Sequence, residues 1–325
     1  MSADNLLEIR GLSVDYATRR GPVHALRRLD LDIRRDGVVG IVGESGCGKS
    51  TLISAILSLL PSNAAIRGGS IHFADADLLS LSGDELRAVR GQRIATVFQD
   101  PMTSLNPVVS IATQLIDVQY RLSGSKAEKR RRAIAMLGRV GIPDPEHRID
   151  EYPHRFSGGM RQRIAIAMAL LVSPMLLIAD EPTTALDVTL EAQIMHLFKE
   201  LRAEFGCSML FVSHNLGLIA ELCDEVVVMY AGEVVERGDV RSIFHDPRHP
   251  YTRLLLACDP ARIEPQRHDL PTIPGSVPDL ARVPAGCVFA ARCSSATAAC
   301  RKERPRARRV HAGHEACCLL VCNDE

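Results

Sequence analysis

The spacing of apolar residues divides the first half of the chain into two regions. From residue 5 to about residue 95, short apolar runs alternate with turns, which predicts the strands and helices of an α/β core. Residues 111–122 and 127–140 instead place apolar residues at helical spacing. We therefore expect a helical subdomain at about residues 100–160.

The second half returns to the α/β pattern before its composition changes. Residues 157–235 again read as alternating strands and helices, whereas proline and cysteine become frequent after residue 232. The sequence thus predicts an α/β core over residues 1–235 and a small, cysteine-rich C-terminal extension over residues 236–325.

One apolar run leads directly into a glycine-rich turn. The run at 38–42 is followed by residues that fit the pattern G-x-x-x-x-G-K-[ST], and a helical stretch begins at residue 52. In this pattern the backbone N–H groups surround phosphate oxygens, Lys49 reaches the β- and γ-phosphates, and the Ser50 hydroxyl binds Mg²⁺. We predict a nucleotide phosphate site at Gly43, Glu44, Ser45, Gly46, Cys47, Gly48, Lys49, Ser50 and Thr51.

A second apolar run, Met175–Ala179, ends in the carboxylates of Asp180 and Glu181. This is the pattern of a central parallel strand whose carboxyl end faces a ligand. Phosphoryl transfer needs one carboxylate on the metal and one on the nucleophile, so we assign Mg²⁺ to Asp180 and the attacking water to Glu181. The alternative is an acidic pair that caps an ordinary strand.

Between these two motifs the chain offers another site for an anion. Ser157 has the character of a helix N-cap, and Gly158 and Gly159 let another group approach the backbone closely. A helix N-terminus at this position places a second anion site about 110 residues after the first.

Together these motifs resemble the ATP-binding subunits of ABC transporters, in which Ser-Gly-Gly-Met-Arg-Gln, here residues 157–162, is the family signature. The resemblance covers residues 5 to about 320. It implies a P-loop NTPase (RecA-like) core and an ABC-type ATPase activity with ATP and Mg²⁺ as cofactors. In this family the signature of one subunit closes over the ATP held by its partner.

The resemblance also assigns roles to four residues outside these motifs. It implies that Tyr16 stacks on adenine, that Gln99 contacts Mg²⁺ and the water, and that His214 contacts the γ-phosphate. Asp187 is expected at the dimer interface. Without the resemblance, each of these residues has an ordinary structural explanation.

Two further segments, 99–107 and 274–278, resemble importers of dipeptides and oligopeptides in particular. This implies a subunit that powers import of peptides or related small solutes from the cytoplasmic face of the inner membrane. The implied partners are a second, similar ABC ATPase subunit, two transmembrane permease subunits and an extracytoplasmic solute-binding protein. A soluble ABC ATPase of DNA repair or translation and a redox-sensing ABC protein remain alternatives.

The charge balance and the apolar segments agree with a peripheral protein. The chain has 39 basic and 39 acidic residues, so no overall positive field favours nucleic acid. Its longest apolar stretch, residues 164–179, is shorter than the roughly 20 residues that span a bilayer. The N-terminus lacks the basic and apolar regions of a secretory signal. We therefore expect membrane contact only through partners.

The extension concentrates cysteine. Seven of the ten cysteines follow residue 257, a density that favours a metal over disulfides in a cytosolic protein. The extension lacks the C-x₂-C pair that zinc sites usually contain. The resemblance to peptide importers implies a [4Fe–4S] cluster, and bound zinc or no bound metal remain the alternatives. On spacing, the predicted ligands are Cys287, Cys293, Cys300 and Cys317, with Cys318 and Cys322 as alternatives to Cys317.

Two smaller features each have two interpretations. Residues 301–309 contain six basic side chains, which indicates a solvated surface or a contact with lipid headgroups or a partner. Cys47 lies beside Lys49 at a helix N-terminus, which favours a reactive thiolate, but it can equally be an inert residue of the loop.

Overall fold

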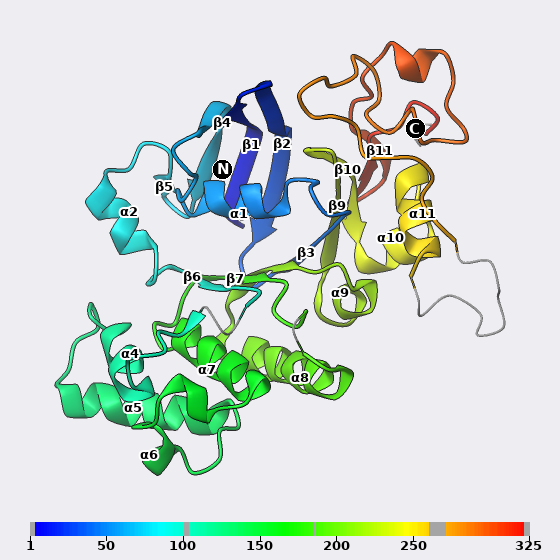
Figure 1. Cartoon of the computed structure of the whole chain (residues 1–325). Coiled ribbons are helices and arrows are strands. Elements are labelled where there is room, and N and C mark those ends of the chain that lie inside the picture. The colour runs from blue at the N-terminus through cyan, green and yellow to red at the C-terminus, as the bar shows by residue number, and fades with distance from the viewer. Residues whose placement is uncertain (1–3, 101–103, 185, 260–270, 322–325) are drawn as a thin grey trace. The chain divides into compact units, whose positions relative to one another are not determined.

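The structure is a computed structural model that describes residues 4–100, 104–184, 186–259 and 271–321. The chain forms two compact units: residues 1–80 together with 213–325, and residues 81–212. Among the described residues, no helix has both the length and the apolar character needed to cross a bilayer. Figure 1 shows the elements of each unit.

The first unit contains an antiparallel sheet that begins at the N-terminus. Its strands alternate buried apolar residues with exposed polar ones, so that one face of the sheet is covered and the other meets water. In spatial order the strands are β2 (Gly21–Arg34), β1 (Asn5–Thr18), β4 (Ala64–Phe73) and β5 (Ala76–Asp77).

A second set of strands in this unit joins the core to the C-terminal extension. Strand β3 (Val38–Val42) is completely buried and pairs in parallel with β9 (Glu225–Tyr230). Strand β9 pairs with β10 (Glu233–Asp239), and the remaining two strands come from the extension. The strand β12 (His314–Ala316) pairs with β10 on one side and with β11 (Arg308–His311) on the other.

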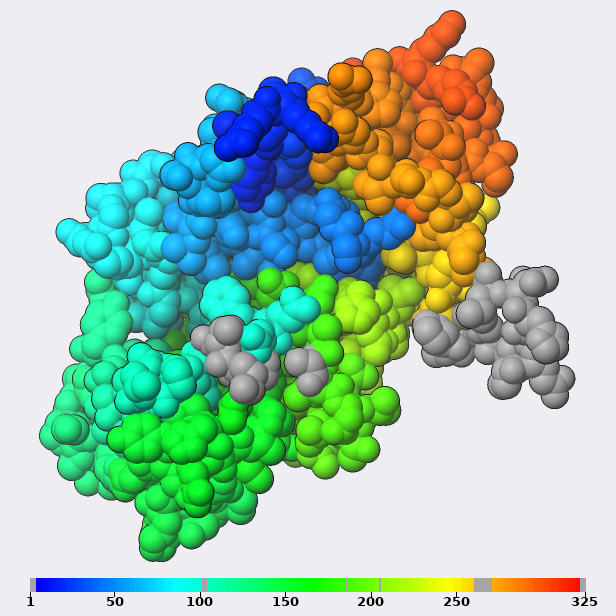
Figure 2. All heavy atoms as spheres, in the orientation of Figure 1, coloured from blue at the N-terminus to red at the C-terminus, as the bar shows by residue number. Residues whose placement is uncertain are grey.

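Helices and a short 3₁₀ turn complete the first unit. They are α1 (Lys49–Ile56), α9 (Leu216–Leu222), α10 (Val240–His245), α11 (Pro250–Ala257) and the 3₁₀ turn Ala299–Arg301. In the space-filling view, the extension lies directly against the N-terminal strands (Figure 2), where the His24 amide donates to the Leu280 carbonyl at 3.0 Å.

The second unit has three parallel strands and most of the helices. The strands β8 (Ser208–Val212), β7 (Leu176–Asp180) and β6 (Ile94–Val97) are adjacent in that order. The helices are α2 (Gly83–Val89), α4 (Ile111–Asp117), α5 (Lys126–Arg139), α6 (Pro145–Arg148), the 3₁₀ turn Pro153–Arg155, α7 (Gly158–Leu170) and α8 (Val188–Phe205). The predicted α/β class and the two helices expected near residues 111 and 127 are therefore present.

Three aromatic rings pack together within the first unit and involve the C-terminal extension. Tyr230 of β9, Tyr251 of α11 and Phe289 of the extension are at most 1% exposed, and their ring centroids lie 4.6 to 5.4 Å apart. Tilted and edge-to-face contacts of this kind stabilise more than their buried area alone. Phe289 of the extension therefore packs on β9 of the core and on α11 of the extension itself.

We expect Phe289→Ala to lower the free energy of unfolding by about 3 to 5 kcal/mol, because it leaves a cavity where a fully buried ring had been. Thermal and denaturant unfolding of the full chain measures this. Leu59→Ala, at a side chain that is 53% exposed, is the control and should change little. A loss below about 1 kcal/mol for Phe289→Ala would show that this cluster does not hold the extension.

Candidate nucleotide site

The loop between β3 and α1 has a shape that only glycine permits at two points. Gly43 has φ 156°, and a Cβ atom there would lie 2.2 Å from the carbonyl oxygen of Met229. Gly48 has φ 107°, and its Cβ would lie 2.8 Å from the carbonyl oxygen of Ala25. Side chains are thus excluded from both ends of the loop, which keeps its backbone amides accessible.

The start of α1 leaves donors for an anion. Gly48 caps the helix without any side-chain hydrogen bond, so the first amides of α1 are not satisfied by a cap. The Nζ atom of Lys49 lies 2.6 Å from the Gly43 carbonyl oxygen, and Lys49 is 8% exposed. Ser50 is exposed beside it. Amides, ammonium and hydroxyl therefore converge on one place, as binding of a magnesium-bound phosphate chain requires.

Tyr16 and His214 belong to the same unit as this loop. The Tyr16 hydroxyl lies 3.3 Å from Oγ1 of Thr51, which places the ring of this β1 residue at the first turn of α1. Ser213 donates its amide to the Ile41 carbonyl at 3.3 Å, so His214 follows a residue bound to the end of β3. The structure thus places Tyr16 beside the end of the phosphate loop and His214 directly after a residue bound to β3.

In the second unit, Gln99 and Glu181 lie together. Their strands pair in parallel with Val97 opposite Ala179, so the residues that follow emerge at the same edge. Gln99 donates from Nε2 to Oε2 of Glu181 at 3.1 Å, and the Thr184 hydroxyl donates to the same oxygen at 3.1 Å. The Glu181 carboxylate is therefore oriented by two neutral donors.

The backbone at Glu181 is held in a rare conformation. Its φ of 47° is uncommon for a residue with a side chain, and its amide donates to the Val212 carbonyl at 2.9 Å. Asp180 is the last residue of β7 and is half-buried. A conformation that costs roughly 1 to 3 kcal/mol and is retained at a strand end is typical of a functional position.

The signature residues and Asp187 are neighbours. Ser157 caps α7 by accepting the Met160 amide at 3.4 Å, and Asp187 caps α8 by accepting the Leu190 amide at 2.9 Å. A Cβ atom on Gly159 would lie 3.0 Å from the Leu190 side chain, whereas one on Gly158 would meet nothing within 4 Å. Gly158 therefore presents open backbone at the helix N-terminus.

Cys47 has surroundings that oppose reactivity. It is 1% exposed, and burial raises the pKa of its thiol more than the neighbouring Lys49 charge lowers it. The structure therefore favours the inert alternative over the reactive thiolate.

The sequence analysis missed the contacts that hold Glu44 of the phosphate loop. The two terminal nitrogens of Arg292, in the extension, donate to the two Glu44 carboxylate oxygens at 2.7 and 3.1 Å. Arg292 also donates to the Tyr230 hydroxyl at 3.2 Å, and its side chain is 4% exposed. These hydrogen bonds, that to Glu44 above all, raise the pKa of Arg292. The Glu44 amide donates to the Tyr251 hydroxyl at 2.9 Å.

No signal in the sequence links these residues. Arg292 is 248 positions from Glu44 along the chain. Only the fold brings an arginine of the extension to the nucleotide site.

The cysteines of the extension divide differently from the prediction. Cys287, Cys293, Cys300 and Cys318 line one cavity of about 10 Å³. Cys317 instead donates its amide to Val235 of β10 at 2.8 Å and lines a different pocket, so the structure does not bring the residue chosen on spacing to the other three. Cys322 lies outside the described residues.

These four thiols are gathered but are not spread out as metal ligands. Among the described residues, no group of three or more His, Cys, Asp or Glu side chains has positions suited to a metal ion. The cavity has room for about one water molecule. Burial raises the pKa of Cys287 to about 11, and that of Cys318 also rises, so the protein itself favours neutral thiols.

Two known families match different parts of the chain. The ABC transporter family matches residues 26–184, and the C-terminal region of oligopeptide and dipeptide transporters matches residues 235–300. The first match includes the phosphate loop and Glu181. The second includes Arg292 and three of the four gathered cysteines.

Relatives that match nearly the whole chain are named as ATP-binding proteins of peptide transport. The probable peptide ABC transporter ATP-binding protein of Sinorhizobium fredii is 47% identical over 97% of this chain and 95% of its own length. The dipeptide transport ATP-binding protein of Bacillus subtilis is 46% identical, and the oligopeptide transport ATP-binding protein of Salmonella typhimurium is 47% identical. Each comparison covers 93% of this chain and 90% of the relative.

Solved structures share the fold of the core. A dimeric ATP-binding cassette in a post-hydrolysis state with ADP and phosphate has a TM-score of 0.64 and 28% identity, over 72% of this chain and 99% of that one. An ABC transporter component from Clostridium perfringens has a TM-score of 0.65 and 31% identity, over 75% and 92%. This confirms the predicted P-loop NTPase core. The chain therefore belongs to the family of ABC transporter ATP-binding proteins, in its oligopeptide and dipeptide branch.

Proposed function

We propose that this chain is the ATP-hydrolysing subunit of an ABC importer for dipeptides, oligopeptides or related small solutes. The observation that carries the proposal is the pairing of Glu181 with Gln99 and Thr184 in a chain that also holds a complete phosphate loop. Relatives named as peptide transport ATP-binding proteins match over 90% or more of their length. This favours an importer over a soluble ATPase of DNA repair or translation.

The residues divide the work of hydrolysis. The amides of the phosphate loop and Lys49 bind the β- and γ-phosphates, and Tyr16 supports the adenine. Ser50, Asp180 and Gln99 are the proposed ligands of Mg²⁺, which neutralises charge on the phosphates when it is bound. Glu181 orients the attacking water. His214 contacts the γ-phosphate.

One chain supplies only part of each site in this proposal. Ser157, Gly158 and Gly159 form an open helix N-terminus, and Asp187 caps the adjacent helix. We propose that they close over the ATP of a second, similar ATPase subunit. Two transmembrane permease subunits and an extracytoplasmic solute-binding protein complete the complex, with this subunit at the cytoplasmic face of the inner membrane. No role for nucleic acid is proposed.

For the extension, we propose a [4Fe–4S] cluster held by Cys287, Cys293, Cys300 and Cys318. The gathering of four thiols around one cavity supports this ligand set, and Cys318 replaces Cys317 in it. Thiolates are suitable ligands for an iron–sulfur cluster. Because burial raises the pKa of Cys287, binding of the cluster must release the protons of the buried thiols. The small cavity requires the four side chains to move apart.

We expect Glu181→Gln to retain ATP binding but to reduce kcat of the assembled transporter at least 100-fold, because the water loses its orienting carboxylate while the phosphate loop is unchanged. Lys49→Ala should instead weaken nucleotide binding itself. ATPase assays and nucleotide titrations separate the two effects. Near-normal turnover of Glu181→Gln would remove Glu181 from this role.

Arg292→Ala should raise KM for ATP about tenfold with a smaller change in kcat, because the freed Glu44 carboxylate repels phosphate and the loop loses its anchor. Arg292→Lys keeps the charge but not the paired geometry and should fall between. Steady-state kinetics and melting temperature are measured for both. A lower melting temperature with unchanged KM would make Arg292 purely structural.

Protein purified without oxygen should contain about four irons per chain and absorb broadly at about 400 nm. Cys318→Ser should abolish both signals, since a hydroxyl is a poor iron ligand, whereas the matched control Cys317→Ser should retain them. Stoichiometric zinc without iron would show that the site binds zinc and not an iron–sulfur cluster. Loss of iron in Cys317→Ser alone would reverse the ligand assignment.

A further inference from the structure

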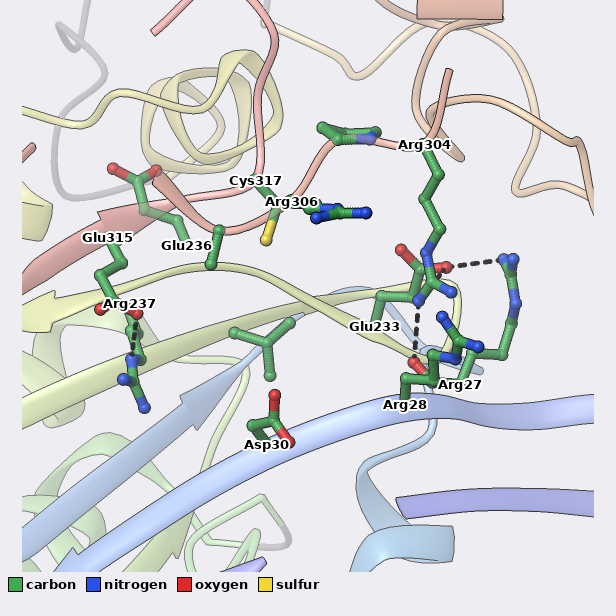
Figure 3. A pocket seen from close by; sticks show the side chains of 13 residues that line it. Arg27, Arg28, Asp30, Glu233, Glu236, Arg237, Arg304, Arg306, Glu315 and Cys317 are labelled. Carbon is green, nitrogen blue, oxygen red and sulfur yellow. Dashed lines mark hydrogen bonds and ion pairs between the residues drawn. The ribbon is translucent and has the colours of Figure 1, made fainter. Parts of the chain in front are cut away.

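One pocket of the first unit lies where the basic run of residues 301–309 folds against β2 and β10 (Figure 3). Its volume of about 520 Å³ is within the range of small-molecule sites. It shares no residue with the phosphate loop. Five arginines line it: Arg27, Arg28, Arg237, Arg304 and Arg306.

At one end of the pocket, two of these arginines share a single carboxylate. Arg27 and Arg304 approach the same Glu233 oxygen at 2.8 and 3.2 Å. Both contacts are close, but neither has the geometry of a directed hydrogen bond, and the Arg27 nitrogen is itself buried. Because two arginines share one carboxylate, one positive charge remains uncompensated here.

Each of the other carboxylates that line the pocket already has a hydrogen-bond or ion-pair partner. Glu236 accepts from Nε2 of His314 at 2.8 Å, and Glu315 pairs with Arg237 at 3.0 Å. Asp30 accepts the Gly11 amide at 2.6 Å.

Arg28 and Arg306 have no ion pair within the described part of the chain, and both are exposed. Arg28 also has φ 49°, a rare conformation that is fixed where its amide donates to the Ser13 hydroxyl at 3.0 Å. A strained residue that holds an unpaired charge at a pocket is typical of a binding position.

From this excess of guanidinium groups we infer that the pocket binds the phosphate group of an anionic ligand through Arg28 and Arg306, aided by the net positive charge at Arg27 and Arg304. The planar fork of arginine matches phosphate oxygens with paired hydrogen bonds. The ligand is either a free phosphorylated small molecule or the headgroup of an anionic lipid.

The test uses the full-length chain with Lys49→Ala, which weakens phosphate binding at the nucleotide loop. Inorganic pyrophosphate is titrated by calorimetry. We expect saturable binding that becomes at least tenfold weaker when Arg28→Ala and Arg306→Ala are added. Arg301→Ala is the matched control, since this exposed arginine of the same run does not line the pocket, and it should leave the affinity unchanged.

Vesicles distinguish the two sources of phosphate. Binding to phosphatidylglycerol vesicles, but not to phosphatidylcholine vesicles, that depends on Arg28 and Arg306 would assign a lipid headgroup. Pyrophosphate binding without vesicle binding would assign a soluble ligand. The inference is overturned if neither probe binds, or if the double variant and Arg301→Ala bind equally well while their melting temperatures match.

Discussion

Glu44 is held from two sides, and both contacts come from beyond the phosphate loop. Arg292 binds its carboxylate through two nitrogens, and the Tyr251 hydroxyl accepts its amide hydrogen. Because the Arg292 side chain is almost fully buried, removing the Glu44 carboxylate would leave the Arg292 charge unpaired in poorly hydrated surroundings. The pair therefore fixes the shape of the loop and the position of the extension at the same time.

The same dependence appears at strand β10, which pairs with the core strand β9 on one side and with the extension strand β12 on the other. Glu236 of β10 is 1% exposed and accepts hydrogen bonds from His314 of β12 and from the His249 amide. A buried carboxylate is tolerated only when such donors surround it. The core and the extension are thus joined by polar contacts as well as by the aromatic cluster.

Local patterns were enough to locate the phosphate loop and the acidic end of a strand in the sequence, whereas Tyr16, Gln99, Asp187 and His214 were predicted only from the family resemblance. A buried parallel strand that ends in a glycine turn or in carboxylates has one geometry, and parallel pairing brings Gln99 to Glu181. The sequence could not distinguish Cys317 from Cys318, because their spacings from the other cysteines differ by only one residue. In an extended segment neighbouring side chains point to opposite sides, so only one of the two can face the other three cysteines. Nor could it reveal the Arg292 contact, which depends on tertiary packing alone.

The residues proposed for phosphate binding and for water activation share a further property: each is held in place within its own unit. The Nζ atom of Lys49 donates to the Gly43 carbonyl oxygen at 2.6 Å, which keeps its charge within the loop. Glu181 is likewise fixed by Gln99, Thr184 and its own backbone. Groups ordered in advance need little reorganisation when charge develops, which is the main source of rate in phosphoryl transfer.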